Sequence, residues 1–228
     1  MRYHTILFDA DNTLLDFARS ERAALTEALQ KMGVVASDEM IAAYSAINLS
    51  MWKRLERGEI TKGELREARF AEFCRRFDLS LDVRVLADHY LESLATKSFL
   101  MEGALAVCET LAAHCRLYII TNGIARVQHG RFDVSPLYPL FEDTFISDEI
   151  GHEKPSTAFF DAVRRKIPDF DAATTLVVGD SLTSDIAGGI AAGLDTCWYD
   201  RNSKGAPQDM AITYTVHTLE EILPLVLR

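Results

Sequence analysis

The hydrophobic pattern of the chain changes twice along its length. Residues 5–8 form a short apolar and β-branched run, which predicts a buried strand. Over residues 17–97, apolar side chains instead recur at intervals of three and four, as at Leu25, Leu29 and Met32, the spacing of an amphipathic helix. Strand-like alternation does not interrupt this region. The pattern therefore predicts one strand followed by a long helical insertion.

Start and stop signals divide the helical region into four helices. Gly33 is a stop for the first, and Ser37, followed by two acidic residues, is a start for the second. Thr61 and Glu64 have the spacing of a capping box and open the third. The fourth carries an apolar stripe at helical spacing: Val83, Leu86, Tyr90 and Leu94.

After the insertion, short β-branched and aromatic runs alternate with helical stretches. The runs are RLYII (116–120), DTFI (143–146), TLVVG (175–179), DTCWY (195–199) and TYTV (213–216). Strands that alternate with helices indicate a parallel sheet covered on both faces. The predicted fold class is therefore α/β, with a doubly wound parallel-sheet core (residues 1–16 and 98–228) and an inserted all-helical cap (residues 17–97).

Charge and composition narrow the choice of partners. The chain of 228 residues carries 24 basic and 34 acidic side chains, a net charge of −10, which argues against nucleic acid or an anionic membrane as partner. No apolar run is long enough to span a bilayer, and the amino-terminal residues lack the pattern of a secretory signal. The four cysteines form no CxxC pair, so we expect reduced thiols and a cytoplasmic protein, either a monomer or a weak homodimer.

Polar residues collect where four of the predicted strands end. Asp9 and Asp11 follow the first strand, and because alternate residues of a strand share a face, their carboxylates should lie close and repel. The other three clusters are Thr121-Asn122-Gly123, Lys154-Pro155 and the segment from Gly179 and Asp180 to Asp185. Ligands of open parallel sheets bind at this edge, and gathered carboxylates favour a hard divalent cation such as Mg²⁺.

The four clusters, in this order, resemble the four motifs of the haloacid dehalogenase superfamily, which consists mostly of Mg²⁺-dependent phosphatases with a Rossmann-like core. A helical insertion directly after the first motif is similar to that superfamily's first-class cap domain. Asn12 stands where glycine is common in the first motif. The stretches TNG, EKP, VGDSLTSDIAGGIAAGLDTCWYD and YTVHTLEEI are similar to a bacterial subgroup of pyrimidine 5′-nucleotidases.

This resemblance implies a role for each site residue. Asp9 is expected to be the nucleophile that forms an aspartyl-phosphate, and Asp11 the general acid and base. The Asp9 carboxylate, the Asp11 main-chain carbonyl and Asp180 would hold Mg²⁺. Asp185 would orient Lys154 or a metal-bound water. The expected phosphate-binding residues are Asp9, Asn12, Thr121, Asn122, Gly123 and Lys154, with Thr121 and Lys154 also counted as catalytic.

The implied function is hydrolysis of a nucleoside monophosphate, with a pyrimidine 5′-nucleotide as the expected substrate. A phosphatase or mutase of sugar phosphates, or of another small phosphorylated metabolite, shares all four motifs and is the alternative. A haloalkanoate dehalogenase needs no acid at the position of Asp11. A phospho-accepting receiver would carry adjacent acids after its first strand and no large helical insert.

Overall fold

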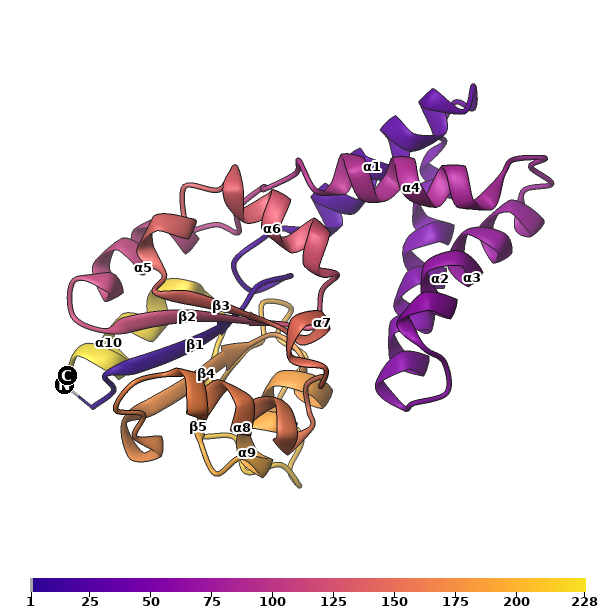
Figure 1. Cartoon of the computed structure of the whole chain (residues 1–228). Coiled ribbons are helices and arrows are strands. Elements are labelled where there is room, and N and C mark those ends of the chain that lie inside the picture. The colour runs from indigo at the N-terminus through magenta and orange to yellow at the C-terminus, as the bar shows by residue number, and fades with distance from the viewer. Residues whose placement is uncertain (1) are drawn as a thin grey trace. The chain divides into compact units, whose positions relative to one another are not determined.

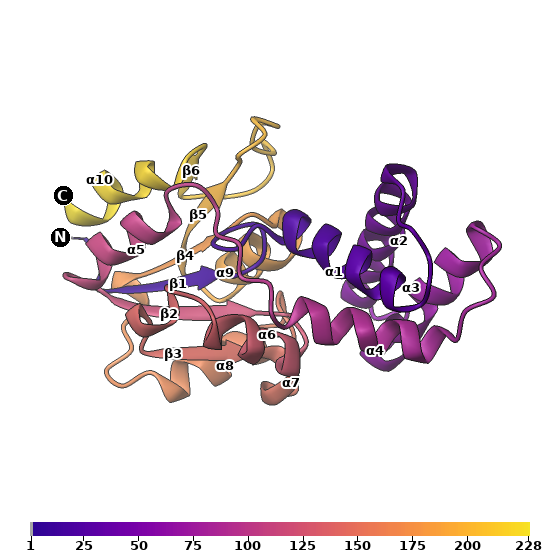
Figure 2. The same ribbon diagram turned by 90° about the horizontal axis from the view of Figure 1, so that it is seen from above.

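The six predicted strands form a single parallel sheet in the computed structural model, which describes residues 2–228. Their order across the sheet is β3-β2-β1-β4-β5-β6, with β1 and β4 at the centre (Figure 2). This confirms the α/β fold class. The strands are β1 (Thr5–Asp9), β2 (Arg116–Thr121), β3 (Asp143–Ile146), β4 (Thr175–Gly179), β5 (Asp195–Tyr199) and β6 (Tyr214–Val216).

Helices cover both faces of this sheet. Figure 1 shows α5 (Ala104–Ala112) and α10 (Ile222–Leu227) on one face, with α8 (Thr157–Lys166) and α9 (Ala187–Ala191) on the other. Because both faces are covered, β1 and β4 are buried along their whole lengths, as their continuous apolar sequences predict. One buried cluster joins the sheet to α8; it contains Leu7, Tyr118, Ile120, Phe145, Phe159, Phe160, Val163, Ile167, Val177 and Leu194.

The strand register places the carboxyl-terminal ends of β1, β2 and β4 next to one another. Asp9, the last residue of β1, lies level with Ile120 of β2, and Phe8 lies level with Val178 of β4. The residues that follow these strands therefore lie side by side at one edge of the sheet (Figure 2). The shorter elements are α6 (Ala125–Asp133), α7 (Ser147–Ile150), η1 (Tyr138–Leu140), η2 (Ala172–Thr174), η3 (Leu182–Ile186) and η4 (Leu219–Glu221).

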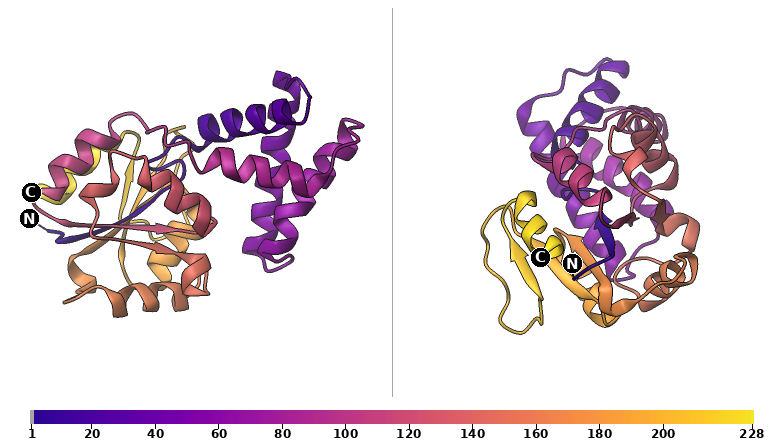
Figure 3. Two further views of the ribbon diagram at one scale, coloured as in Figure 1. Left: turned by 45° about the horizontal axis from the view of Figure 1, so that its top comes forward. Right: turned by 90° about the vertical axis from the view of Figure 1, so that its left-hand side faces the viewer.

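The inserted region is helical, as its 3.6-residue periodicity predicts. Ser37 caps its second helix by accepting a hydrogen bond from the Met40 amide, and Thr61 and Glu64 form the predicted capping box. Figure 3 shows these helices from two further directions. They are α1 (Phe17–Lys31), α2 (Asp38–Glu56), α3 (Lys62–Arg76) and α4 (Val83–Leu94).

The interior of the helical region combines aromatic packing with a buried polar chain. Tyr44 packs against Phe70 and Tyr90, with ring centroids 5.1 and 5.3 Å away. Beside them, the Asn48 side chain donates to Glu21 Oε1 (2.7 Å) and accepts from Arg69 Nη1 (2.8 Å). Asn48 thereby links two buried, oppositely charged side chains without direct contact between them.

The chain divides into two compact units. The first contains residues 2–16, 100–128 and 135–228, and the second contains residues 17–99 together with residues 129–134. The second unit thus includes a segment of α6 that lies well outside the predicted cap: the buried Arg131 donates through Nε to the Lys97 carbonyl oxygen (2.9 Å). That residues 17–97 form a separate cap domain, with the remainder as core, stays a prediction.

Three further features of the described residues bear on the sequence analysis. All four cysteines are buried and carry free thiols. Within residues 2–228, none of the helices combines the length and apolar character needed to cross a membrane. At the opposite end of the sheet from the polar clusters, the Arg2 amide donates to the Val226 carbonyl oxygen (3.3 Å), so the two ends of the core meet.

Candidate active site

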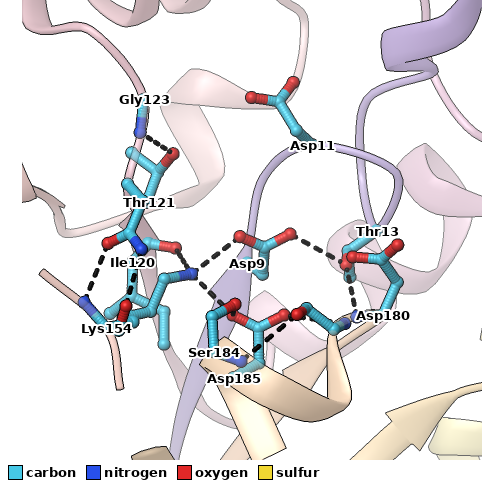
Figure 4. A network of polar contacts seen from close by, with 12 residues as sticks. Asp9, Asp11, Thr13, Ile120, Thr121, Gly123, Lys154, Asp180, Ser184 and Asp185 are labelled. Atoms are coloured by element: carbon cyan, nitrogen blue, oxygen red, sulfur yellow. Dashed lines mark hydrogen bonds and ion pairs between the residues drawn. The ribbon is translucent and has the colours of Figure 1, made fainter. Parts of the chain in front are cut away.

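The carboxylates of Asp9, Asp180 and Asp185 meet at the carboxyl edge of the sheet, around Lys154 (Figure 4). Asp9 ends β1 and Asp180 directly follows β4, so the sheet itself sets their spacing. Asp185 lies in η3, a π-helical turn whose start is capped by Ser181. Because Gly179 has no Cβ, the Asp185 side chain can lie against the end of β4; a Cβ there would be 2.3 Å from Asp185 Oδ2.

Lys154 is the centre of this group. Its side chain is buried, and its ammonium donates to Asp9 Oδ1 (2.8 Å), Asp185 Oδ1 (2.7 Å) and the Ile120 carbonyl oxygen (2.8 Å). An ammonium group has three hydrogens, so these bonds use all of its donors. Lys154 therefore binds the carboxylates of the site, and its expected contact with substrate phosphate stays a prediction.

Both carboxylate oxygens of Asp9 have a partner. Oδ1 accepts from Lys154, and Oδ2 accepts from the Thr13 hydroxyl at 3.0 Å. The same hydroxyl accepts a hydrogen bond from the Asp180 amide (3.1 Å), which ties the loop after β1 to the end of β4. The Asp9 side chain is thus held in one orientation from two sides, as a nucleophile requires.

The carboxylates carry more negative charge than Lys154 can neutralise. Burial, and then the charge of Asp185, raise the pKa of Asp9 well above its usual value, although Lys154 acts in the opposite direction. Burial and Asp185 likewise raise the pKa of Asp180 to about 7. Burial lowers the pKa of Lys154, but Asp185 and Asp9 outweigh it, and the pKa ends above its usual value. Lys154 is therefore charged, and the site still has excess negative charge.

A divalent cation would balance this excess negative charge. Asp9, Asp180 and Asp185 can each offer one carboxylate oxygen, and these atoms lie within 4.8 Å of one another. Asp180 is the least committed of the three, since no described residue donates a hydrogen bond to its carboxylate. Three carboxylate oxygens at one point form a donor set for a hard cation such as Mg²⁺. Asp185 bonds to Lys154, as the resemblance implied, and its carboxylate also lies close enough to those of Asp9 and Asp180 to be a candidate ligand.

Asp11 lies apart from the three carboxylates. Figure 4 shows its carboxylate away from the group around Lys154. The reason is local: β1 ends at Asp9, and the chain then turns through Asn12, which has a positive φ of 65°. Alternation along a strand therefore does not apply beyond Asp9, and the expectation that Asp9 and Asp11 share a face is wrong. The carboxylates that crowd Asp9 are Asp180 and Asp185.

The predicted phosphate-binding loops are present, but several of their polar groups bond internally. The Asn122 side chain makes a pair of 2.8 Å hydrogen bonds with the backbone of Lys154, and so fixes the lysine. The amide of Asn12 donates to the Leu15 carbonyl oxygen (2.8 Å). The amide of Gly123 donates to Thr121 Oγ1 (3.1 Å). These contacts order the loops around the site.

Two residues outside the predicted site contact it directly. Thr13 binds Asp9 as described, and Gln128 donates from Nε2 to Asp11 Oδ2 (3.0 Å) and to Thr121 Oγ1 (2.8 Å). Thr13 could have been found, because it stands in the same short cluster as the two aspartates. Gln128 could not have been found in this way, because it lies outside the four polar clusters, in the first turn of a helix.

This geometry agrees with the comparison to known proteins. A family model described as haloacid dehalogenase-like hydrolase matches residues 3–193. The chain belongs to this family. The matched residues include all four polar clusters, from the strand that ends at Asp9 to the helix that follows Asp185.

Full-length relatives and a solved structure support the same assignment. PynA of Streptococcus pneumoniae, a pyrimidine 5′-nucleotidase, is 37% identical over 98% of this chain and 94% of its own length. YjjG of Escherichia coli, also a pyrimidine 5′-nucleotidase, is 31% identical over 97% of both proteins. The crystal structure of YfnB from Bacillus subtilis, bound to magnesium and described as revealing interdomain movement, is 36% identical, has a TM-score of 0.94 and covers 99% of both chains.

Proposed function

We propose that this haloacid dehalogenase-like hydrolase is a Mg²⁺-dependent phosphatase that hydrolyses pyrimidine nucleoside 5′-monophosphates. The observation that carries the reaction type is the separation of two aspartates. Asp9 is buried and held at both oxygens, as suits a nucleophile, whereas the partly exposed Asp11 is held apart by Gln128, as suits an acid and base. A dehalogenase has no need for the second of these groups.

The proposed reaction has two steps. The Asp9 carboxylate attacks phosphorus, the ester P–O bond breaks, and the leaving alkoxide takes a proton from Asp11. Water then attacks the aspartyl-phosphate, gives a proton to Asp11 and releases inorganic phosphate, which regenerates Asp9. Lys154 favours the ionised form of Asp9 and holds its carboxylate in position between turnovers.

The three carboxylates Asp9, Asp180 and Asp185 would hold Mg²⁺, with the Asp11 main-chain carbonyl as a further candidate ligand. The bound cation supplies positive charge that stabilises the oxygens of the transferring phosphoryl group. Thr121 and the loop amides that are not bonded internally would bind the same oxygens. The magnesium-bound structure of the relative YfnB supports this choice of metal.

The choice of substrate rests on relatives. PynA and YjjG are pyrimidine 5′-nucleotidases, and each aligns with almost the whole chain, including the helical insertion. We propose that residues 17–97 act as a cap that supplies substrate selectivity. We further propose a cytoplasmic location and a monomer or weak homodimer, with a small phosphorylated metabolite as the only partner needed for activity.

Phosphate release from a panel of substrates tests this proposal. The panel contains uridine, deoxyuridine and thymidine monophosphates, the purine nucleoside monophosphates and hexose phosphates. We expect turnover with Mg²⁺, loss with chelator, recovery on readdition of Mg²⁺, and the highest kcat/KM for a pyrimidine nucleotide. Asp9→Asn, purified identically, controls for contaminating phosphatases. Equal turnover with chelator would refute the metal role, and a hexose phosphate as best substrate would favour the sugar-phosphate alternative.

A further inference from the structure

Gln128 is a buried side chain that contacts both the proposed acid and base and the proposed phosphate-binding threonine. It lies in the first turn of α6 and is 1% exposed. Its Nε2 atom is 3.0 Å from Asp11 Oδ2 and 2.8 Å from Thr121 Oγ1. A side-chain amide nitrogen has two hydrogens, so each contact uses one of them.

The orientation of the amide follows from charge. If the amide were turned over, its oxygen would face the Asp11 carboxylate, and two acceptors would repel each other. With nitrogen in that place, Asp11 Oδ2 accepts a hydrogen bond whether or not the carboxyl is protonated. The proton of the acid form is then confined to Oδ1, because Oδ2 already faces a donor. Gln128 thereby determines which oxygen of Asp11 can transfer a proton.

The same amide determines the role of Thr121. The Thr121 hydroxyl oxygen accepts from Gln128 Nε2 and from the Gly123 amide (3.1 Å). A hydroxyl oxygen has two lone pairs, and these two contacts occupy both. Its hydrogen therefore remains for donation, and no acceptor for it is found among residues 2–228. A donor at this point suits the oxygen of a phosphate group.

Gly123 leaves the space through which the Gln128 side chain reaches these two groups. A Cβ at position 123 would lie 2.5 Å from Gln128 Nε2 and 2.7 Å from its Cδ and Cγ atoms. Real Cβ atoms do not approach this closely, so any larger residue would displace the amide. The glycine of the TNG segment is thus explained by the passage of a side chain as well as by the turn.

We propose that Gln128 is a positioning residue that fixes the proton-carrying oxygen of Asp11 and fixes Thr121 as a hydrogen-bond donor to phosphate. This inference rests on the proposed phosphatase function. It predicts a specific kinetic pattern, because the two effects depend differently on the leaving group of the substrate. The Thr121 effect is common to every phosphate ester, whereas the Asp11 effect grows with the leaving group's need for a proton.

The test compares Gln128→Met, which keeps length but has no N–H donor, with the wild type on two esters. For a pyrimidine nucleoside monophosphate, whose alkoxide needs a proton, we expect kcat/KM to fall about 10–100-fold. For p-nitrophenyl phosphate, whose leaving group hardly needs one, the fall should be at least about fivefold smaller. Gln30→Met, the same change on the exposed face of α1, should leave both values unchanged.

Gln128→Glu has the shape of the native residue and gives an independent readout. Its carboxyl can donate to Asp11 only when protonated, so the activity relative to wild type should rise as pH falls from 8 to 5. An unchanged Gln128→Met enzyme, an equal loss on both esters, or a Gln128→Glu enzyme without this rise would overturn the inference. A wild-type protein that releases no phosphate from any ester would instead refute the proposed function, and the inference with it.

Discussion

Lys154 Nζ lies 2.8 Å from Asp9 Oδ1 and 2.7 Å from Asp185 Oδ1, in a position where the lysine side chain is 1% exposed. One buried cation thus faces two buried carboxylates, and a third, Asp180, lies beside them. The Asn122 side chain in turn forms hydrogen bonds with the backbone of Lys154. The one cation and the three carboxylates therefore depend on one another, and removal of one member should affect both stability and catalysis.

We first predict that Lys154→Met destabilises the metal-free protein by about 3–5 kcal/mol, because it leaves buried carboxylates without their partner. Activity should be lost as well, since Asp9 would lose the partner that favours its ionised form and fixes its position. Urea unfolding monitored by circular dichroism measures the change. Lys53→Met, at an exposed position of α2, is the control and should change stability by less than about 0.5 kcal/mol.

A second substitution separates charge from packing in this result. With Asp185→Asn added to Lys154→Met, one unpaired charge is gone, and the double variant should be more stable than the single Lys154→Met variant. If the double variant is the less stable of the two, the ion pair is not the reason for the loss.

The second prediction concerns pH and metal affinity. The pKa of Asp180 is raised to about 7 by burial and by Asp185, so a proton competes with Mg²⁺ at this carboxylate. The apparent affinity for Mg²⁺ should therefore weaken as pH falls below 7, by about tenfold per pH unit for one competing proton. Trp198 donates from Nε1 to the Asp180 carbonyl oxygen (2.9 Å), and its fluorescence in a Trp52→Phe background can report binding.

Stability in the absence of metal should follow the opposite trend. A carboxyl whose folded pKa is raised destabilises the folded state when ionised, and this penalty is relieved as pH falls from about 7 toward the unfolded value of 3.8. In chelator, the Tm difference between wild type and Asp180→Asn should shrink over that range. A difference that stays constant between pH 8 and pH 5 would argue against a raised pKa at Asp180.

The third prediction concerns the helical unit. Asn48 forms hydrogen bonds with both the buried Glu21 and the buried Arg69. The change Asn48→Ala therefore removes one hydrogen bond from each of these two charged groups. We expect a loss of about 3 kcal/mol or more in the stability of this unit. Trp52 of α2, as the sole tryptophan in a Trp198→Phe background, reports unfolding there. Asn202→Ala, an exposed loop position, should have little effect, and equal losses in both variants would contradict the prediction.

The sequence predicted the fold well because its signals are local. Buried parallel strands need continuous apolar runs, and capping residues such as Ser37 and Thr61 act within one helical turn. The sequence could not predict that residues 129–134 belong with the helical unit. That grouping depends on contacts such as Arg131 with the Lys97 carbonyl, which join positions 34 residues apart.

For the candidate site, the sequence predicted the residue types and some contacts, such as that between Asp185 and Lys154, but not the position of Asp11. The motifs named Asp9, Lys154 and Asp180, which the structure brings together at the sheet edge. The direction of Asp11 depends on the positive φ of Asn12, and no spacing rule contains that information. The contact between Asp11 and Gln128 joins residues 117 positions apart, so it too required the folded chain.

The last prediction separates the roles of the two aspartates that follow β1. Asp9→Asn should abolish turnover, because a neutral amide cannot form an acyl-phosphate and is a weaker ligand for the cation. Asp11→Asn should still bind substrate and Mg²⁺, since its main-chain carbonyl is retained, but it loses proton transfer, typically about 10²–10⁴-fold. With p-nitrophenyl phosphate the first step needs little proton transfer, so phosphoenzyme should accumulate on Asp9.

Rapid quench followed by mass spectrometry of Asp11→Asn measures this accumulation directly. The Asp9→Asn variant is the control and should show no added phosphate under the same conditions. The two variants differ in where the reaction stops: Asp9→Asn before any covalent bond forms, and Asp11→Asn after it. If Asp11→Asn shows no phosphoenzyme and loses the same factor with activated and ordinary esters, Asp11 is not the acid and base. Its bond to Gln128 would then serve only to order the loop after β1.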